Sequence, residues 1–256
     1  MRIIRVEHGG TSYYGILEDG LVFRLHQQPG HMEPIPLSEA KVLPLVTPSK
    51  VVCVGLNYKA HAEELGYPLP NMPSFFLKPP SSIIGNGEPI VLPSGMGRIE
   101  HEAELAMVVG KVCRNLTPEE AEESLFGFTC ANDVTAREVQ KVDPLIGHCK
   151  SYDTFCPIGP WIETELEDIN DLSIRCLVNG EVRQSANTGD MIFRPLDLLC
   201  FLSRVMTLMP GDVILTGTPP GISPIQADDV VQVSIEGIGT LSNPVEGPGP
   251  EAKILQ

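Results

Sequence analysis

The sequence has few positive charges and no basic run of five or more residues. Its 256 residues include 18 Lys and Arg against 33 Asp and Glu, which gives a formal net charge of −15. A nucleic-acid partner would need clustered Lys and Arg side chains to neutralise its phosphates. This composition therefore argues against a nucleic-acid-binding function.

The sequence also lacks a long apolar run. Its most apolar later window, residues 196–208, contains Asp197 and Arg204 and is too short to cross a bilayer. Residues 1–7 have no apolar stretch of the kind that a signal peptide carries. We therefore expect a cytoplasmic protein with no membrane partner.

No Cys-x-x-Cys pair occurs among the seven cysteines, which stand at positions 53, 113, 130, 149, 156, 176 and 200. An odd number at these spacings argues against a disulfide framework and against a zinc ribbon. We expect most of the thiols to be small buried apolar groups in a reducing compartment.

What the chain does contain is the composition of a folded domain rich in turns. Hydrophobic residues make up 42% and charged residues 20%, and 24 glycines and 24 prolines favour short strands joined by turns over a helical bundle. A chain of this length can bury roughly 70–75% of its unfolded surface without disulfide or metal staples. The expected fold class is mainly β with some α (α+β).

Alternation, caps and turn residues locate the expected elements. Residues 1–47 should form a small N-terminal β-rich domain, and residues 48–256 the catalytic domain. Expected strands cover residues 2–7, 12–17, 21–25, 50–55, 74–78, 102–109, 126–132, 212–216, 229–236 and 239–245. Expected helices cover residues 58–65 and 117–125, and two more begin at a capping box on Thr135 and at Pro195.

Three carboxylates form the most informative pattern. Glu102 and Glu104 alternate on a β-prone run, so their side chains project from the same strand face, roughly 6–7 Å apart. Asp133 follows at the end of the next strand, and Lys150 comes later. Two neighbouring anions raise each other's pKa unless a cation lies between them. The set suggests a hard divalent cation beside a positively charged substrate contact, whereas Glu-x-Glu alone would equally fit a solvated strand face.

Six sequence blocks, in this order, resemble the short form of the fumarylacetoacetate hydrolase family, over roughly residues 50–245. They are Gly55-Leu-Asn-Tyr-Lys-Ala-His61, His101-Glu-Ala-Glu104, Ala131-Asn-Asp133, Lys150-Ser-Tyr-Asp-Thr-Phe-Cys-Pro-Ile-Gly-Pro160, Asn187-Thr-Gly-Asp-Met191 and Gly211-Asp-Val-Ile-Leu-Thr-Gly-Thr-Pro-Pro-Gly221. The resemblance implies a β-roll or sandwich that carries the site, and a homodimer. The chain departs from many family members at Ser151, where they have glycine.

The resemblance implies that Glu102, Glu104 and Asp133 bind Mg²⁺ or Mn²⁺, which matches the preference of these ions for oxygen ligands. Zinc is the competing metal, because His61, His101 and His148 are available, but nothing in the sequence places the three together.

The resemblance also assigns catalytic roles. Lys150 would be directed at the substrate from a loop and would stabilise the oxyanion that forms on a 2-oxo group. His61 and Glu64, three apart on one helix face, would polarise a water, with Glu64 fixing the imidazole tautomer. The alternatives are a solvated lysine and an ordinary surface His–Glu pair. The Gly- and Pro-rich residues 66–73 could form a lid.

Other positions receive weaker predictions. The resemblance assigns substrate hydrogen bonds to Gln140 and Thr218. The residues Asn187, Thr188 and Asp190 could line the pocket or only cap a turn, and a structural role is expected for Lys78 rather than a substrate contact. A phosphate loop is rejected, because Gly217 to Gly221 lacks the Gly-Lys-Ser/Thr ending.

These assignments predict an enzyme that acts on short 2-oxo acids through an enolate that the metal and Lys150 stabilise. Hydrolysis of acylpyruvates and decarboxylation of oxaloacetate-like acids are the leading reactions. Isomerisation or decarboxylation of 2-hydroxyhepta-2,4-diene-1,7-dioate is the alternative, since it passes through a related dienolate. An alternative of another class is a metal-stabilised β domain that binds organic acids without catalysis, which would have no use for His61, Glu64 and Lys150 together.

Overall fold

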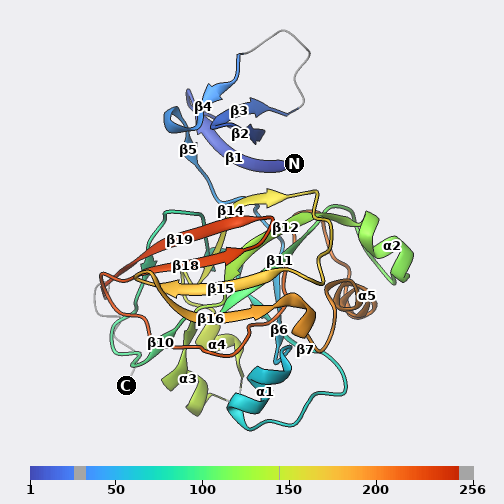
Figure 1. Cartoon of the computed structure of the whole chain (residues 1–256), viewed down its shortest axis with the longest axis vertical. Helices are drawn as coiled ribbons and strands as arrows, with labels where there is room; N and C mark the ends of the chain where they lie inside the picture. The colour runs from blue at the N-terminus through green and yellow to red at the C-terminus, as the bar shows by residue number, and fades with distance from the viewer. Residues whose placement is uncertain (26–32, 144, 248–256) are drawn as a thin grey trace.

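The computed structural model describes residues 1–25, 33–143 and 145–247. Strands dominate, which confirms the expected α+β class. A 12-stranded sheet runs in the order β4-β3-β2-β1-β14-β12-β11-β17-β6-β7, and in addition β5 pairs with β1 and β8 pairs with β14. A 5-stranded sheet runs in the order β16-β15-β18-β19-β9. Figure 1 shows the second sheet lying across the central strands of the first.

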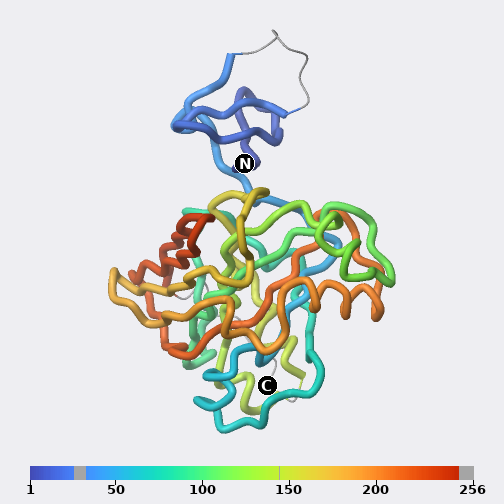
Figure 2. The backbone as a smooth tube through the Cα atoms, turned by 45° about the vertical axis from the view of Figure 1, so that its right-hand side comes forward, coloured from blue at the N-terminus to red at the C-terminus, as the bar shows by residue number. Residues whose placement is uncertain are grey.

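The N-terminal strands confirm the hairpin pattern that the turns predicted. They are β1 (Arg2–His8), β2 (Thr11–Glu18), β3 (Leu21–Arg24), β4 (Ile35–Pro36) and β5 (Lys41–Val42), with a 3-10 turn at Leu37–Glu39. Strand β1 also pairs antiparallel with β14 (Cys156–Glu163), where Ile3 lies opposite Ile162. The N-terminal strands therefore extend the central sheet, at the end of the molecule that is uppermost in Figures 1 and 2.

The other strands follow in chain order. They are β6 (Val51–Gly55), β7 (Ser74–Lys78), β8 (Ile83–Ile84), β9 (Ile90–Val91), β10 (Ile99–Glu100), β11 (Ala103–Val109), β12 (Leu125–Asn132), β13 (Thr135–Ala136), β15 (Ser173–Val178), β16 (Glu181–Asn187), β17 (Val213–Leu215), β18 (Val230–Ile235) and β19 (Gly239–Glu246).

The helices are short and lie around the sheets. They are α1 (Lys59–Leu65), α2 (Pro118–Glu123), α3 (Arg137–Val142), α4 (Gly147–Lys150) and α5 (Pro195–Val205), with 3-10 turns at Pro80–Ser82 and Thr188–Asp190. In Figures 1 and 2, α1, α3 and α4 gather at the end of the molecule opposite the N-terminal strands. Within the described residues, no helix combines the length and apolarity that a bilayer crossing requires.

Strand β11 is buried on both faces and separates two apolar clusters. On one face Leu105 and Met107 belong to the larger cluster, which includes Ile174, Val233 and other residues of the second sheet. On the other face Ala106 and Val108 belong to a smaller cluster. By strand alternation Glu104 shares the Ala106 face. The polar site therefore lies at the end of a face that is otherwise apolar.

The smaller cluster joins the N-terminal strands to the central sheet. It contains Ile3 and Val6 of β1 together with Ile158 and Ile162 of β14. This shared apolar packing, in addition to the backbone pairing, holds the two parts of the chain together.

The capping box expected at Thr135 is wrong. Thr135 belongs to β13, and α3 begins at Arg137 with no side-chain cap. The Thr135 hydroxyl instead bonds Glu102 Oε1 at 3.1 Å and the Asp133 carbonyl at 2.9 Å. The hydroxyl contacts the acidic site in place of capping the helix.

Candidate active site

The pairing of β11 with β12 brings the three predicted carboxylates together. Ala103 lies opposite Asn132, and the Asp133 amide donates to the Glu102 carbonyl at 2.8 Å, so the residues just outside the two strands are neighbours. Oxygen atoms of Glu102, Glu104 and Asp133 lie within 4.8 Å of one another. All three residues are buried. Within the described residues, no other group of three His, Cys, Asp or Glu side chains converges in this way.

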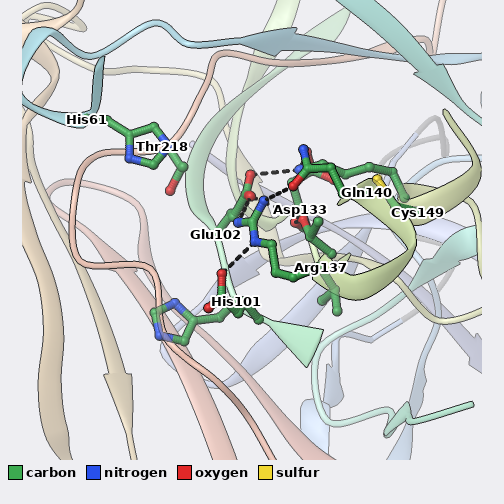
Figure 3. A network of polar contacts seen from close by, with 12 residues as sticks. His61, His101, Glu102, Asp133, Arg137, Gln140, Cys149 and Thr218 are labelled. Carbon is green, nitrogen blue, oxygen red and sulfur yellow. Dashed lines mark hydrogen bonds and ion pairs between the residues drawn. The ribbon is translucent and has the colours of Figure 1, made fainter. Parts of the chain in front are cut away.

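Glu102 is surrounded by positive charge. Lys150 Nζ lies 2.7 Å from Glu102 Oε2 and 2.6 Å from Asp133 Oδ2, and Arg137 Nη2 donates to Glu102 Oε1. Burial by itself raises the pKa of Glu102, but the charges of Lys150 and Arg137 outweigh it and hold that pKa well below its usual range. Glu102 is therefore an anion. Figure 3 shows Arg137 reaching the Glu102 carboxylate.

A buried lysine fixes Asp133. Lys78 is only 1% exposed, and its Nζ donates to Asp133 Oδ1 at 2.5 Å and to the Phe155 carbonyl at 2.7 Å. Lys78 is not among the residues that line the neighbouring cavity. This arrangement agrees with the structural role that we expected for Lys78.

At Glu104 the effect of burial on the pKa dominates, and the charge of Lys150 and the Gly217 amide offset it only in part. Glu104 Oε2 accepts a hydrogen bond from the Gly217 amide at 2.5 Å, and no Lys, Arg or His within the described residues forms an ion pair with it. Burial raises the pKa of Glu104 well above its usual range, and the negative charges of Asp133 and Glu102 raise it further. A buried carboxylate that faces two others is the environment that a divalent cation would stabilise. Three hard oxygen donors fit Mg²⁺ or Mn²⁺.

The structure does not bring the three histidines of the zinc alternative together. His101 is buried, with Nδ1 at 3.0 Å from Gln184 Oε1 and Nε2 at 2.8 Å from Ser223 Oγ. In Figure 3 its ring is turned away from the Glu102 carboxylate. His148 is largely exposed and pairs with Asp143. The candidate metal site is thus a set of carboxylate oxygens and not a cluster of these three histidines.

A cavity of about 290 Å³ opens beside the triad. His61 of α1 lines it, and its Nδ1 lies 2.8 Å from Glu64 Oε2. The other oxygen of Glu64 accepts from the Gly221 amide at 3.0 Å, which fixes the carboxylate behind the imidazole. His61 is 5% exposed, so the pair is not an ordinary surface contact.

Lys150 lies in an element that we did not expect. It is the last residue of α4 rather than part of a loop, and it is 3% exposed. Burial lowers its pKa, but Asp133 and Glu102 outweigh this effect and raise the pKa above its usual range. The loop interpretation failed because four residues are too few to show a helical period.

Gln140 and Thr218, the two predicted substrate contacts, both line the cavity, and both also form hydrogen bonds within the protein. Gln140 Oε1 accepts from Arg137 Nη1 at 2.8 Å. The Thr218 hydroxyl donates to the Ala103 carbonyl at 2.9 Å and accepts from Gln184 Nε2 at 2.8 Å. Thr218 thus supports the strand that bears the carboxylates, and its substrate contact stays a prediction.

The Asn187–Asp190 segment caps a turn. Asn187 Oδ1 accepts from the Gly189 amide at 2.7 Å, and Thr188 Oγ1 accepts from the Leu172 amide at 2.9 Å. None of Asn187, Thr188 and Asp190 is among the cavity-lining residues. Of the two roles considered for them, the structure shows the cap.

Sequence reasoning missed Arg137. It lines the cavity, its Nε contacts Glu100 Oε2 at 2.5 Å, and its other nitrogens contact Glu102 and Gln140. The available signal was its position three residues before Gln140, which places both on one face of a helix. The prediction of a capping box at Thr135 treated this segment only as a helix start, so it gave Arg137 no role in the site.

Comparisons with known proteins agree with this geometry. A family model described as "Fumarylacetoacetate (FAA) hydrolase C-terminal" matches residues 50–246, and one described as "Rv2993c-like, N-terminal" matches residues 1–44. A human mitochondrial oxaloacetate tautomerase is 42% identical over 225 residues, which cover 82% of this chain and 71% of that protein.

Solved structures of two bacterial enzymes are similar over nearly the whole chain. One, from Mycobacterium smegmatis, is described as a 5-carboxymethyl-2-hydroxymuconate delta-isomerase; it is 42% identical, covers 98% of this chain and 100% of that one, and has a TM-score of 0.90. The other is a maleylpyruvate hydrolase from Sphingobium sp. SYK-6 in complex with manganese(II) and pyruvate, which is 30% identical, covers 97% and 100% of the two chains, and has a TM-score of 0.82.

Proposed function

The chain belongs to the fumarylacetoacetate hydrolase family, and we propose that it is a Mg²⁺- or Mn²⁺-dependent enzyme that hydrolyses the C–C bond of short acylpyruvates. One observation carries this proposal: a single cavity is lined by the three carboxylates, by Lys150 and by His61, which is paired with Glu64. A protein that only bound organic acids would not need a buried histidine that is paired with a carboxylate. The manganese and pyruvate in the maleylpyruvate hydrolase structure support a 2-oxo acid as the ligand class.

A divalent cation held by Glu102, Glu104 and Asp133 would supply Lewis-acid chemistry toward the 2-oxo acid end of the substrate. Lys150 contributes positive charge at the same place. Its Nζ contacts Glu102 and Asp133, so its charge lies beside two of the carboxylates that would hold the cation. The role of Lys150 is to stabilise negative charge on that oxygen when the C–C bond breaks.

His61 acts as the base for the attacking water. A carboxylate only accepts hydrogen bonds, so the contact with Glu64 Oε2 assigns the proton to His61 Nδ1 and leaves Nε2 able to take a proton. Water adds to the distal acyl carbonyl as Nε2 removes its proton. The C–C bond then breaks, and its electron pair forms the enolate of pyruvate. A proton delivered to the enolate carbon completes pyruvate, and the acyl group leaves as a carboxylic acid.

A second candidate is proton transfer without bond cleavage. The names of two relatives, an oxaloacetate tautomerase and a hydroxymuconate delta-isomerase, favour it. The same charge would stabilise an enolate or dienolate, while a proton moves between carbon atoms or between carbon and oxygen without attack by water. Isomerisation of 2-hydroxyhepta-2,4-diene-1,7-dioate is a reaction of this kind. Decarboxylation of oxaloacetate-like acids does break a C–C bond, but like the isomerisation it needs no nucleophilic water.

Product analysis of His61→Ala separates these reactions. We expect the wild-type protein with Mg²⁺ to release pyruvate from acetylpyruvate, and we expect His61→Ala to lower that rate by about 10²–10⁴-fold, the usual contribution of a general base. Isomerisation of 2-hydroxyhepta-2,4-diene-1,7-dioate, followed by absorbance, should fall less.

His148→Ala is the matched control, because His148 also pairs with a carboxylate, at 3.0 Å, but does not line the cavity. If His61→Ala lowered the rates of hydrolysis and isomerisation equally, His61 would have no specific role in activating water. Conversion of oxaloacetate or the dienedioate with no pyruvate from any acylpyruvate would favour the second candidate.

A further inference from the structure

The outer part of the cavity differs chemically from the inner part. Two short helices each contribute one polar and one apolar side chain to the lining, four residues apart: His61 and Leu65 on α1, and Lys150 and Ile146 on α4. Residues four apart lie on the same helix face, separated by about 6 Å along the axis. Ile146 directly precedes α4 and has helical angles, φ −49° and ψ −27°, so the relation holds there too.

The exposed fractions of these four residues show which end of each pair lies nearer the solvent. His61 and Lys150 are 5% and 3% exposed, whereas Leu65 and Ile146 are each 42% exposed. Tyr67, which follows α1, also lines the cavity and is largely exposed. The substrate therefore meets polar groups at the inner end and an apolar wall about one helical turn farther out.

Among the residues that the structure describes, positive charge in the cavity lining lies at the inner end. The lysine and arginine that line the cavity are Lys150 and Arg137. Lys150 contacts Glu102 and Asp133, and Arg137 contacts Glu100, Glu102 and Gln140. Both are thus held against carboxylates of the triad region. A second carboxylate at the far end of a substrate would meet Leu65, Tyr67 and Ile146 and lose its hydration without gaining an ion pair.

We propose that Leu65, Tyr67 and Ile146 form an acyl subsite, which selects 2-oxo acids with an uncharged apolar far end and rejects those with a terminal carboxylate. This inference rests on the proposed 2-oxo acid function. A cavity of about 290 Å³ is at the small end of the usual range for ligand pockets, roughly 300–1,000 Å³, so the substrate has one short chain. For acylpyruvates, the subsite takes the alkyl part of the acyl group.

Two stable acids of equal length test the subsite. They are 2-oxooctanoate, which ends in a methyl group, and 2-oxooctanedioate, which ends in a carboxylate. Titration calorimetry with the Mg²⁺-loaded protein should show at least tenfold tighter binding of 2-oxooctanoate. In the series from pyruvate through 2-oxobutanoate to 2-oxohexanoate, each methylene that reaches the wall should lower Kd by about fourfold.

Two arginine substitutions distinguish an effect of the subsite on ligand preference from an effect of the overall negative charge of the chain. Ile146→Arg places a cation in the wall and should reduce the tenfold preference to parity or reverse it. Val142→Arg makes the same charge change at a residue that is 82% exposed and does not line the cavity, and should leave the preference in place.

Equal or tighter binding of 2-oxooctanedioate by the wild-type protein would overturn the subsite. So would an equal change of preference in both arginine variants, which would indicate a bulk charge effect. Binding of pyruvate, which has no alkyl chain to reach the subsite, distinguishes a failure of the subsite from a failure of the proposed function. If pyruvate binds but the apolar acid gains nothing, the subsite alone is wrong; if pyruvate and both longer acids fail to bind with Mg²⁺ present, the 2-oxo acid function fails and the subsite with it.

Discussion

At the scale of single residues, the three carboxylates are held in different ways. Lys150 and Arg137 stabilise the charge of Glu102, and Lys78 holds one oxygen of Asp133. Glu104 has only the Gly217 amide, and it is buried beside two other anions. Charge balance at Glu104 is therefore the feature of the site that a divalent cation would change most.

We predict that Glu104→Gln separates stability from metal binding. The raised pKa of Glu104 means that the folded metal-free protein must bind a proton there, or hold a repelled charge, at neutral pH. Gln avoids this cost, so the metal-free variant should have a higher Tm than the metal-free wild-type protein. Mg²⁺ at 100 times its Kd should stabilise the wild-type protein by about 2.7 kcal/mol and the variant hardly at all. Thermal unfolding with Mg²⁺ or with EDTA measures both effects.

Glu64→Gln is the control for that prediction, because it makes the same substitution at a carboxylate outside the triad. It should keep the Mg²⁺-dependent rise in Tm. A Glu104→Gln variant that Mg²⁺ stabilises as strongly as the wild-type protein would show that Glu104 is not a ligand.

Residue-level prediction from the sequence succeeded where a local pattern encodes position. Alternation placed Glu102 and Glu104 on one strand face, and helical spacing placed His61 beside Glu64. It failed for Arg137 and Thr135, because their partners are Glu100 and Glu102, more than thirty residues away. Contacts of this kind depend on strand pairing, which local spacing does not reveal.

At the scale of elements, the loop after α5 is tied to the start of two parallel strands. Asp212 precedes β17 and is fully buried. Its oxygens accept from the Ser49 amide at 2.9 Å, the Ser49 hydroxyl at 2.7 Å and the Met209 amide at 2.8 Å, and Lys50 Nζ lies at 2.5 Å. This carboxylate fixes β17 against β6, whose end leads to the cavity.

We predict that Asp212→Asn destabilises the fold by about 2 kcal/mol, since one neutral oxygen replaces a charged acceptor of several hydrogen bonds. Burial raises the pKa of Asp212, but the hydrogen bonds from Lys50, Met209 and Ser49 outweigh it, and the folded pKa lies below the ordinary value of 3.8. A depressed carboxylate pKa contributes stability above the unfolded pKa, and that stability is lost as pH falls through the folded pKa.

Urea unfolding of EDTA-treated protein between pH 7 and pH 3 measures this contribution. The wild-type protein should lose stability below about pH 4 more steeply than Asp212→Asn, so the two curves should converge. Asp153→Asn, at an exposed aspartate, should follow the wild-type curve. Parallel curves for Asp212→Asn and the wild-type protein would contradict the assigned role.

At the scale of the whole molecule, the strand-rich class and most elements could be predicted, because alternation, caps and turn residues are local. The pairing of β1 with β14 could not, since it joins residues 159 and 161 positions apart in a sheet whose order differs from the chain order. The boundary between residues 47 and 48 and the homodimer stay predictions. The continuous sheet and the shared apolar cluster show that the N-terminal strands are packed as part of one structure with the rest.

We propose that β11 and β12 together present three oxygen ligands to one divalent ion at the inner end of the cavity. The most direct measurement is anomalous diffraction from crystals of the protein grown with Mn²⁺. We expect one strong peak per chain, in contact with the carboxylates of Glu102, Glu104 and Asp133. A protein that hydrolyses acylpyruvates at full rate while its Mn²⁺ lies elsewhere, or is absent, would show that these three carboxylates are not the ligands of the catalytic ion.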